Sequence, residues 1–233
     1  MTVHYDDIQA QKSENVVVIS KSGKNSEMPA FKNSYNRVGK RVFDVSIIVA
    51  ALPFVLIIIA LLAACVAIRG GAPFYTQDRI GYGGRVYRIW KLRTMIVNAD
   101  AHLERHLAED TAARSEWNTT QKLKNDPRIT KFGRFLRRSS LDELPQLWNV
   151  LRGEMSLVGP RPMMPNQTEL YTGTTYYNLR PGISGSWQVS ARNASSFAER
   201  AVFDADYGQK VSLAEDVRIL AATVKVVFRG TGY

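Results

Sequence analysis

The run VFDVSIIVAALPFVLIIIALLAACVAI, from Val42 to Ile68, decides how this chain is organised. It is long enough to cross a membrane, because about 20 apolar residues in a helix span the hydrocarbon core. Its one charged residue is Asp44, and Pro53 lies near its middle. Proline removes a backbone donor, and its ring tends to kink a helix. The run therefore predicts a membrane helix with a kink at Pro53.

Two features of this run favour a re-entrant helix over a simple span. The two legs on either side of Pro53 come to about 16 Å and 24 Å at roughly 1.5 Å per residue, each short of a roughly 30 Å core. Basic residues stand on both flanks, and the positive-inside rule places both flanks in the cytoplasm. A kinked single-pass helix is the alternative, because membrane helices tolerate proline. The flanking residues are Lys32, Arg37, Lys40 and Arg41 before the run, and Arg69, Arg79, Arg85, Arg88, Lys91 and Arg93 after it.

Length and charge narrow the organisation further. The 233 residues suffice for one sizeable core, a membrane element and a tail. We expect a disordered polar tail over 1–34, the membrane helix with its basic flank over 35–70, and one domain over 71–233. Lys and Arg outnumber Asp and Glu by 31 to 21, which favours phosphate-bearing partners. The single cysteine, Cys65, excludes an intramolecular disulfide and a cysteine-based metal site, and it indicates a reducing compartment.

The segment after the apolar run predicts a mixed α/β fold of the α+β type. Strand-forming residues around the glycine-rich turn at Gly81–Gly84 indicate a β-hairpin. Helical patterns follow, and together with the hairpin they predict a small, mostly helical domain. The helices are expected over 98–117, 130–138, 142–151, 196–210 and 212–228.

Three features of these helices have more than one interpretation. The apolar face of 212–228 can pack on the core, which we expect, or lie in the headgroup layer of a membrane. His102 and His106 share a four-residue spacing, but we expect a solvated helix face there and not a metal site. Trp148 and Trp187 are expected to pack in the core.

An acidic pair lies in a basic setting in Ser140-Leu-Asp142-Glu143, which follows Arg134, Arg137 and Arg138. The pattern fits a capping box, in which the Ser140 hydroxyl and the Glu143 carboxylate satisfy free N–H groups at a helix start. It fits chemistry equally well, since neighbouring arginines hold a phosphorylated substrate while a carboxylate attacks it or binds Mg²⁺. From the residues alone, both interpretations stay open.

Three ordered motifs resemble those of the bacterial sugar transferases, the monotopic polyprenyl-phosphate phosphoglycosyl transferases. They are KLRTM at 91–95, DPRITKFGRFLRRSSLDELPQLWNVLRGEMSLVGPRP at 126–162 and RPGISGSWQVSARN at 180–193. The resemblance covers about residues 38–233. The ending, with SFAERAVFDADYG at 196–208 and RGTGY at 229–233, is similar to the branch that initiates exopolysaccharide synthesis. In this family the helix break typically falls at a Ser-Pro pair, and here Leu52 replaces the serine.

The resemblance implies roles for particular residues. Asp142 would be the nucleophile that attacks the sugar-linked phosphate of a UDP-sugar, expels UMP and forms a covalent phosphosugar. Undecaprenyl phosphate would then accept the galactose 1-phosphate or glucose 1-phosphate. Asp142 and Glu143 would hold Mg²⁺. The expected substrate-binding residues are Lys91, Arg137, Arg161, Arg180 and Arg192.

The resemblance also implies a place in the cell. The protein is expected in the bacterial inner membrane, with its catalytic domain on the cytoplasmic face and against the cytoplasmic leaflet. We expect no nucleic-acid partner, and the oligomeric state stays open, a homo-oligomer included. The competing hypothesis is a non-catalytic, membrane-tethered basic module that binds anionic lipid or nucleic acid. The acidic pair amid arginines and the rigid Pro160-Arg161-Pro162 favour the enzyme, because a binding module needs neither.

Overall fold

The computed structural model describes residues 35–120, 123–190 and 197–228. These residues belong to one compact unit, 31–233. The expected tail, 1–34, lies outside the described residues. The predicted mixed, mostly helical fold of the α+β type is confirmed. The helices run as follows: α2 Lys40–Ala67, α3 Ala99–Glu109, α4 Thr111–Thr120, α5 Lys131–Arg138, α6 Gln146–Leu151, α7 Ser186–Ser190, α8 Arg200–Lys210 and α9 Leu213–Phe228.

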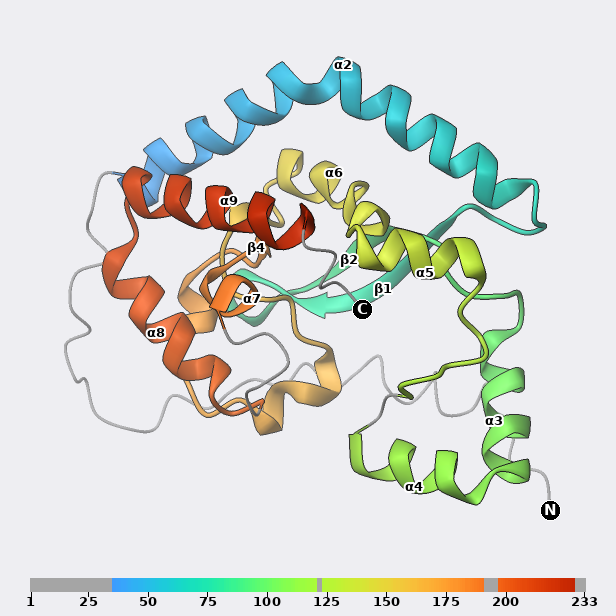
Figure 1. Ribbon diagram of the computed structural model, residues 1–233. Helices are drawn as coiled ribbons and strands as arrows, with labels where there is room; N and C mark the ends of the chain where they lie inside the picture. Colours follow the sequence, from blue (N-terminus) through green and yellow to red (C-terminus); the bar gives the residue numbers. More distant parts are fainter. Residues whose placement is uncertain (1–34, 121–122, 191–196, 229–233) are drawn as a thin grey trace. The chain divides into compact units, whose positions relative to one another are not determined.

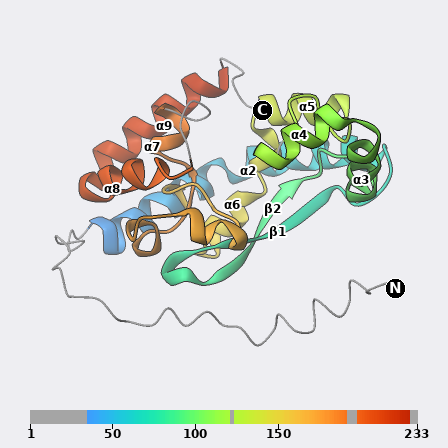
Figure 2. The ribbon, with the colours of Figure 1, turned by 90° about the horizontal axis from the view of Figure 1, so that it is seen from below.

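The strands form two small sheets. β1 (Phe74–Ile80) and β2 (Val86–Leu92) pair antiparallel, with Arg79 opposite Tyr87 and Tyr75 opposite Lys91, so the predicted hairpin is confirmed. β3 (Ser156–Val158) and β4 (Gly182–Ser184) pair in parallel. Figure 2 shows α3 and α4 toward one end of the β1–β2 ribbon and α8 and α9 toward the other.

Helix α2 is continuous through Pro53 and arches over α6 (Figure 1). The helix is thus curved but unbroken, with Pro53 inside it. The helix is long and apolar enough to cross a membrane, and only 11% of its most apolar window is buried in the protein. Large side chains such as Phe54 and Leu61 are exposed along it. Because water disfavours so much apolar surface, this helix needs an apolar environment.

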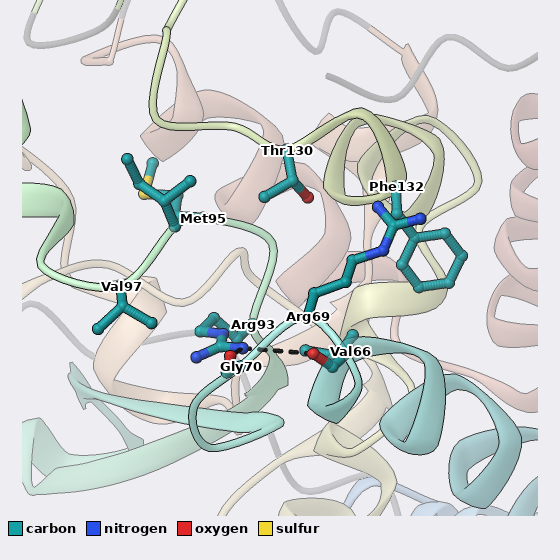
Figure 3. Close-up of a pocket in the computed structure, with 9 residues that line it drawn as sticks. Val66, Arg69, Gly70, Arg93, Met95, Val97, Thr130 and Phe132 are labelled. Atoms are coloured by element: carbon teal, nitrogen blue, oxygen red, sulfur yellow. Dashed lines mark hydrogen bonds between the residues drawn. The ribbon is translucent and has the colours of Figure 1, made fainter.

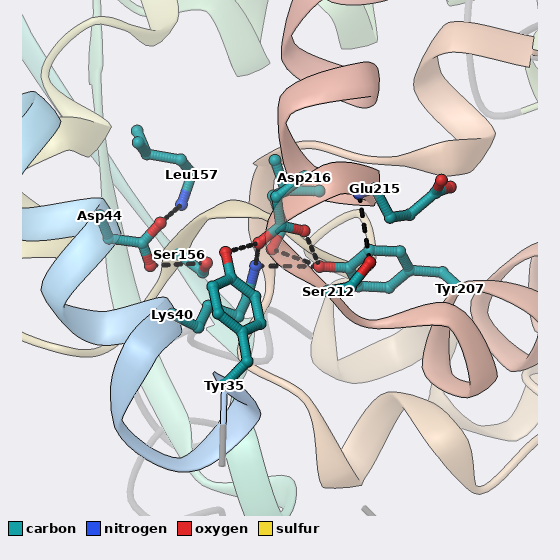
Figure 4. Close-up of polar contacts among 10 residues, drawn as sticks. Tyr35, Lys40, Asp44, Ser156, Leu157, Tyr207, Ser212, Glu215 and Asp216 are labelled. Atoms are coloured by element: carbon teal, nitrogen blue, oxygen red, sulfur yellow. Dashed lines mark hydrogen bonds and ion pairs between the residues drawn. The ribbon is translucent and has the colours of Figure 1, made fainter. Parts of the chain in front are cut away.

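A buried polar cluster fixes the N-terminal end of α2 to the rest of the domain (Figure 4). The Lys40 Nζ lies 2.5 Å from the Asp216 Oδ2 of α9 and donates to the Tyr207 hydroxyl at 2.9 Å. Asp44, the one acid of the apolar run, accepts hydrogen bonds from the Ser156 hydroxyl at 2.7 Å and the Leu157 N–H at 3.2 Å. Each buried charge thus has a partner, as burial requires.

The C-terminal end of α2 is fixed to the same domain. Val66 packs against Leu92 and Leu136, and the Arg93 guanidinium donates to the carbonyls of Val66 and Gly70. Figure 3 shows Arg93 beside a cavity of about 100 Å³ at this end of the helix. Both ends of α2 are therefore held by one domain, while its middle stands away from it.

Two predicted helices differ from the observed ones. The helix expected over 98–117 is divided into α3 and α4 at Asp110, whose carboxylate accepts hydrogen bonds from the N–H groups of Ala112 and Ala113 at 2.9 Å. An aspartate that caps a new helix competes with continuation of the old one. The helix expected over 142–151 begins only at Gln146, after a 3-10 turn at Leu141–Glu143 and Pro145.

The hydrophobic core lies between the hairpin, β3, α6, α8 and α9. Val150, Val158 and Ile219 are fully buried in it, and Ile48 of α2 joins them. Helix α9 packs on this core through Ile219, as expected, and leaves Val217 and Val224 exposed. The core thus holds the hairpin and the segment that carries the acidic pair in fixed positions.

Candidate active site

The acidic pair lies on a tight turn between α5 and α6. Helix α5 begins at a Thr130 cap, whose hydroxyl accepts the Gly133 N–H at 2.8 Å. Ser140 then adopts a left-handed backbone conformation with φ 56°, which non-glycine residues rarely take. Its side chain makes no capping hydrogen bond. The capping-box interpretation is therefore wrong.

The turn brings four of the predicted site residues together. The Glu143 carboxylate, in place of a capping bond, pairs with the Lys91 Nζ of β2 at 2.8 Å. Asp142 is buried, with 8% of its surface exposed. The Arg137 Nε donates to the Thr94 hydroxyl at 2.8 Å, and the charges of Lys91 and Arg137 both act on Asp142. Two acids and two cations thus form one mixed-charge cluster.

The pKa of Asp142 is raised to about 6, mainly because burial disfavours the carboxylate. Lys91 and Arg137 act in the opposite direction, and the charge of Glu143 adds to the rise. The carboxylate is still ionised at neutral pH. A raised pKa makes it a better nucleophile or base than a solvated aspartate.

The cluster has the donor set of a magnesium site that is completed by substrate. Among the residues that the structure describes, no three His, Cys, Asp or Glu side chains gather in a way that could hold a metal. Mg²⁺ is commonly bound through one or two carboxylates plus substrate phosphates. Asp142 and Glu143 fit that pattern and not a metal cage made by the protein alone.

An apolar groove of about 250 Å³ is lined by residues of α2, α6 and the hairpin. Leu144 and Pro145, which follow Glu143 directly, line one part of it, and Leu52 and Val55 of α2 line another. Trp148 also lines it and is 55% exposed, so the expected core packing of Trp148 is wrong. Trp187, by contrast, is buried as expected.

Two other predicted site residues, Arg161 and Arg180, have different contacts. Arg161 stands over the Trp187 ring at 5.8 Å, and the Arg180 Nε donates to the Gly153 carbonyl at 3.0 Å. Neither makes a hydrogen bond or ion pair with Asp142 or Glu143. Arg192 lies outside the described residues. The Arg180 interaction is that of a structural side chain that braces a loop.

Sequence reasoning did not single out two residues that organise this region. Asn149 is fully buried. Its side-chain oxygen Oδ1 accepts a hydrogen bond from the Trp90 N–H at 3.1 Å, and its side-chain Nδ2 donates to the Arg88 carbonyl at 2.7 Å. It thereby fixes α6 against the strand that carries Lys91. Arg79 of β1 donates to the Pro162 carbonyl at 3.3 Å. The sequence offered one signal for each residue. Asn149 is a polar residue in a helix that packs on the core, and Arg79 is a cation on the strand face that also carries Lys91.

Known proteins are similar to this chain over most of its length. A family model described as bacterial sugar transferase matches residues 35–230. A UDP-galactose-lipid carrier transferase from Erwinia amylovora is 47% identical over 203 residues, which cover 84% of this chain and 42% of that protein. The chain thus spans about two fifths of that relative.

Two further relatives are closer to this chain in length. The exopolysaccharide production protein ExoY of Sinorhizobium fredii is 43% identical over 201 residues, which cover 84% of this chain and 88% of that protein. A UDP-glucose:undecaprenyl-phosphate glucose-1-phosphate transferase of Caulobacter vibrioides is 38% identical over 198 residues, which cover 79% of this chain and 68% of that protein.

Proposed function

Because the chain belongs to the bacterial sugar transferase family, we propose that it moves a hexose 1-phosphate from a UDP-sugar to undecaprenyl phosphate at a membrane. The sugar is galactose or glucose, the two named for its relatives. The transfer initiates assembly of an exopolysaccharide repeat unit, a role that the likeness to ExoY supports.

One observation carries this proposal. A buried carboxylate, Asp142, stands among Glu143, Lys91 and Arg137, and the residues that follow in sequence, Leu144 and Pro145, line an apolar groove. The cations suit a substrate phosphate, and the groove suits a lipid tail. A site that only bound anionic lipid would have no use for a buried acid whose charge opposes that lipid.

The reaction proceeds in two displacements at phosphorus. An ionised Asp142 oxygen attacks the sugar-linked phosphorus of the donor, and the bond to the nucleotide phosphate breaks with its electron pair, which releases UMP. The phosphate oxygen of undecaprenyl phosphate then attacks the same phosphorus and displaces the Asp142 carboxylate. Lys91 and Arg137 offset the negative charge that gathers on the phosphate oxygens in both steps.

Mg²⁺ is part of the proposal. Asp142 and Glu143 would hold it together with substrate oxygens, and it would supply positive charge to the diphosphate. The pairing of Glu143 with Lys91 keeps the Glu143 carboxylate oriented before substrate arrives.

The membrane arrangement follows from α2. Both ends of the helix are tied to one domain, and the groove opens beneath the arch. A re-entrant helix, which enters and leaves through the cytoplasmic face of the inner membrane, places the groove at the level of the lipid acceptor. The acceptor phosphate then reaches the acidic pair while its tail stays in apolar surroundings.

Release of UMP tests the proposal. Membranes that contain the protein are expected to release UMP from UDP-galactose or UDP-glucose in the presence of Mg²⁺ and undecaprenyl phosphate. Asp142→Asn should reduce release by at least about a hundredfold, since it removes the nucleophile. Asp78→Asn, which changes an exposed aspartate of the hairpin, is the matched control and should keep full release. No release by the unaltered protein with either donor would contradict the proposal.

A further inference from the structure

Three arginines gather in a second group, and the charge of Glu143 acts on one of them, Arg79. Arg79 comes from β1, Arg161 from the loop after β3, and Arg200 from the first position of α8. The Arg200 guanidinium lies over the Trp187 ring at 4.3 Å and over the Phe197 ring at 4.4 Å. These rings hold the planar cation in position without neutralising it.

The three cations lie close enough to repel one another. Burial and the charges of Arg161 and Arg79 together lower the pKa of Arg200 to about 10. Burial and the charge of Arg161 also lower the pKa of Arg79. Three like charges in a partly desolvated place cost the folded state free energy.

Protein groups offset these charges only in part, since the charge of Asp204 acts on Arg200 and that of Glu143 acts on Arg79. Within the described residues, no carboxylate forms an ion pair with Arg79, Arg161 or Arg200. Asp204, whose charge acts on Arg200, accepts a hydrogen bond from the Tyr171 hydroxyl at 2.8 Å, and burial raises its pKa to about 7. The Nε atoms of Arg79 and Arg200 are buried, and neither has a hydrogen-bond partner among the residues that the structure describes. Unsatisfied cationic donors of this kind indicate a missing anion.

The hairpin connects this cluster to the acidic pair. Arg79 lies opposite Tyr87, and Lys91 stands four residues farther along β2, on the same face, because side chains alternate along a strand. Their backbone positions are about 13 Å apart at roughly 3.3 Å per residue, and the charge of Glu143 still acts on Arg79. A diphosphate substrate can therefore engage both places.

The apolar groove lies on the opposite face of the same hairpin. Phe74 of β1 and Trp90 of β2 line the groove. Because side chains alternate along a strand, these two belong to the face of the hairpin opposite to that of Arg79 and Lys91. The lipid tail and the arginine cluster thus lie on opposite faces of β1 and β2. This separation favours the nucleotide over the lipid as the ligand of the arginines.

We propose that Arg79, Arg161 and Arg200 form a binding site for the nucleotide phosphate of the donor, the phosphate that leaves as UMP. The inference rests on the proposed function and adds Arg79 and Arg200 to the residues that it requires. When the bond between the two phosphates breaks, its electron pair moves to the nucleotide phosphate oxygen, which the guanidinium groups stabilise. The same site retains UMP until the product leaves.

Binding of UMP by the full chain in lipid nanodiscs tests this site without turnover. Isothermal titration with UMP alone is expected to show about tenfold or greater loss of affinity in Arg79→Gln and in Arg200→Gln, since each loses a charge-assisted contact. Arg88→Gln is the matched control, because Arg88 lies on the other face of the hairpin and its side chain is 77% exposed. Its affinity should equal that of the unaltered chain.

Two further readouts separate a ligand site from a structural one. The thermal midpoint of Arg200→Gln without nucleotide should not fall, because the substitution relieves repulsion. The KM for the UDP-sugar should rise in both variants, while the KM for undecaprenyl phosphate stays the same. Arg200→Lys, which keeps the charge and loses the planar group, should lie between Arg200→Gln and the unaltered chain in UMP affinity.

Unchanged UMP affinity in Arg79→Gln and Arg200→Gln would overturn the inference. So would a higher KM for undecaprenyl phosphate with unchanged UMP binding, because that result assigns the site to the lipid phosphate. A protein that binds UMP through these arginines but transfers no sugar phosphate would refute the proposed function and leave the nucleotide site standing.

Discussion

Asp142 combines two properties that a solvated aspartate cannot combine. Burial raises its pKa, so its oxygen is more basic, and Lys91 and Arg137 keep that rise small enough for ionisation at neutral pH. Glu143 is adjacent in sequence but pairs with Lys91. Two neighbouring acids thus take different roles because their surroundings differ.

The raised pKa predicts how the first chemical step depends on pH. If an ionised Asp142 attacks the donor, formation of the phosphosugar adduct should slow about tenfold between pH 7.5 and pH 5, as the carboxylate takes up a proton near pH 6. Single-turnover mass spectrometry without lipid acceptor measures this rate. A rate that stays level across this range, with the fold intact at pH 5, would contradict the assignment.

The same pKa predicts an effect on stability. A folded-state pKa of about 6, above the ordinary 3.8, means that the folded chain holds this proton more tightly than the unfolded chain. The resulting stabilisation is complete below pH 3.8 and is lost as pH rises through 6, at a cost of about 3 kcal/mol. Asp142→Asn imitates the protonated acid and avoids this cost.

The thermal midpoint in detergent checks the stability effect. Asp142→Asn should raise it at pH 8 and change it little at pH 4. Asp78→Asn, at an exposed position, should leave it unchanged at both values. A lower midpoint for Asp142→Asn at pH 8 would mean that the ion pairs around Asp142 outweigh its burial.

At the scale of elements, α6 links the acidic pair to the apolar groove. Its first turn follows the acidic pair, Asn149 fixes it to β2, and Trp148 points its ring into the apolar groove. In the proposed function, this helix of six residues would place the chemistry before its first turn and the lipid contact at Trp148.

Trp148 is the residue that tests this division. Trp148→Ser should raise the KM for undecaprenyl phosphate about tenfold or more, because it removes a large apolar contact, and should leave the UDP-sugar step unchanged. The aromatic control is Tyr82→Ser, which changes an exposed residue at the tip of the hairpin. Equal loss in both half-reactions would argue against a separate lipid groove.

Local patterns predicted most of these elements, and long-range contacts decided the rest. Strand alternation around Gly81–Gly84 predicted the hairpin, and α5 begins at Thr130 as expected. The capping box failed because Lys91, far away in the sequence, takes the Glu143 carboxylate. Arg79 and Arg200 were not recognised, since only the folded chain places them beside Arg161.

At the scale of the whole molecule, the proposed re-entrant arrangement rests on the arch of α2. Both ends of the helix are bound to one domain, by Lys40 with Asp216 at one end and by Arg93 at the other. A single cysteine placed before α2, at Val38, or after it, at Ile68, reports the side of the membrane that each end faces; both positions are exposed. Cys65 is first replaced by serine.

The re-entrant arrangement predicts that a membrane-impermeant thiol reagent labels both cysteines in inverted vesicles and neither in intact cells. Labelling of Ile68→Cys in intact cells, with Val38→Cys protected, would establish the single-pass alternative. In that case the two ends of α2 could not both contact one domain as they do here.

Intact-mass spectrometry of the purified chain, with Mg²⁺ and UDP-galactose or UDP-glucose but no lipid acceptor, addresses the covalent mechanism most directly. We expect an added mass of one hexose phosphate with one of the two donors, its absence in Asp142→Asn, and its discharge when undecaprenyl phosphate is added. That result would also identify the sugar. No adduct with either donor, together with full turnover once lipid is present, would contradict nucleophilic attack by Asp142 and leave the acidic pair as metal ligands for direct transfer.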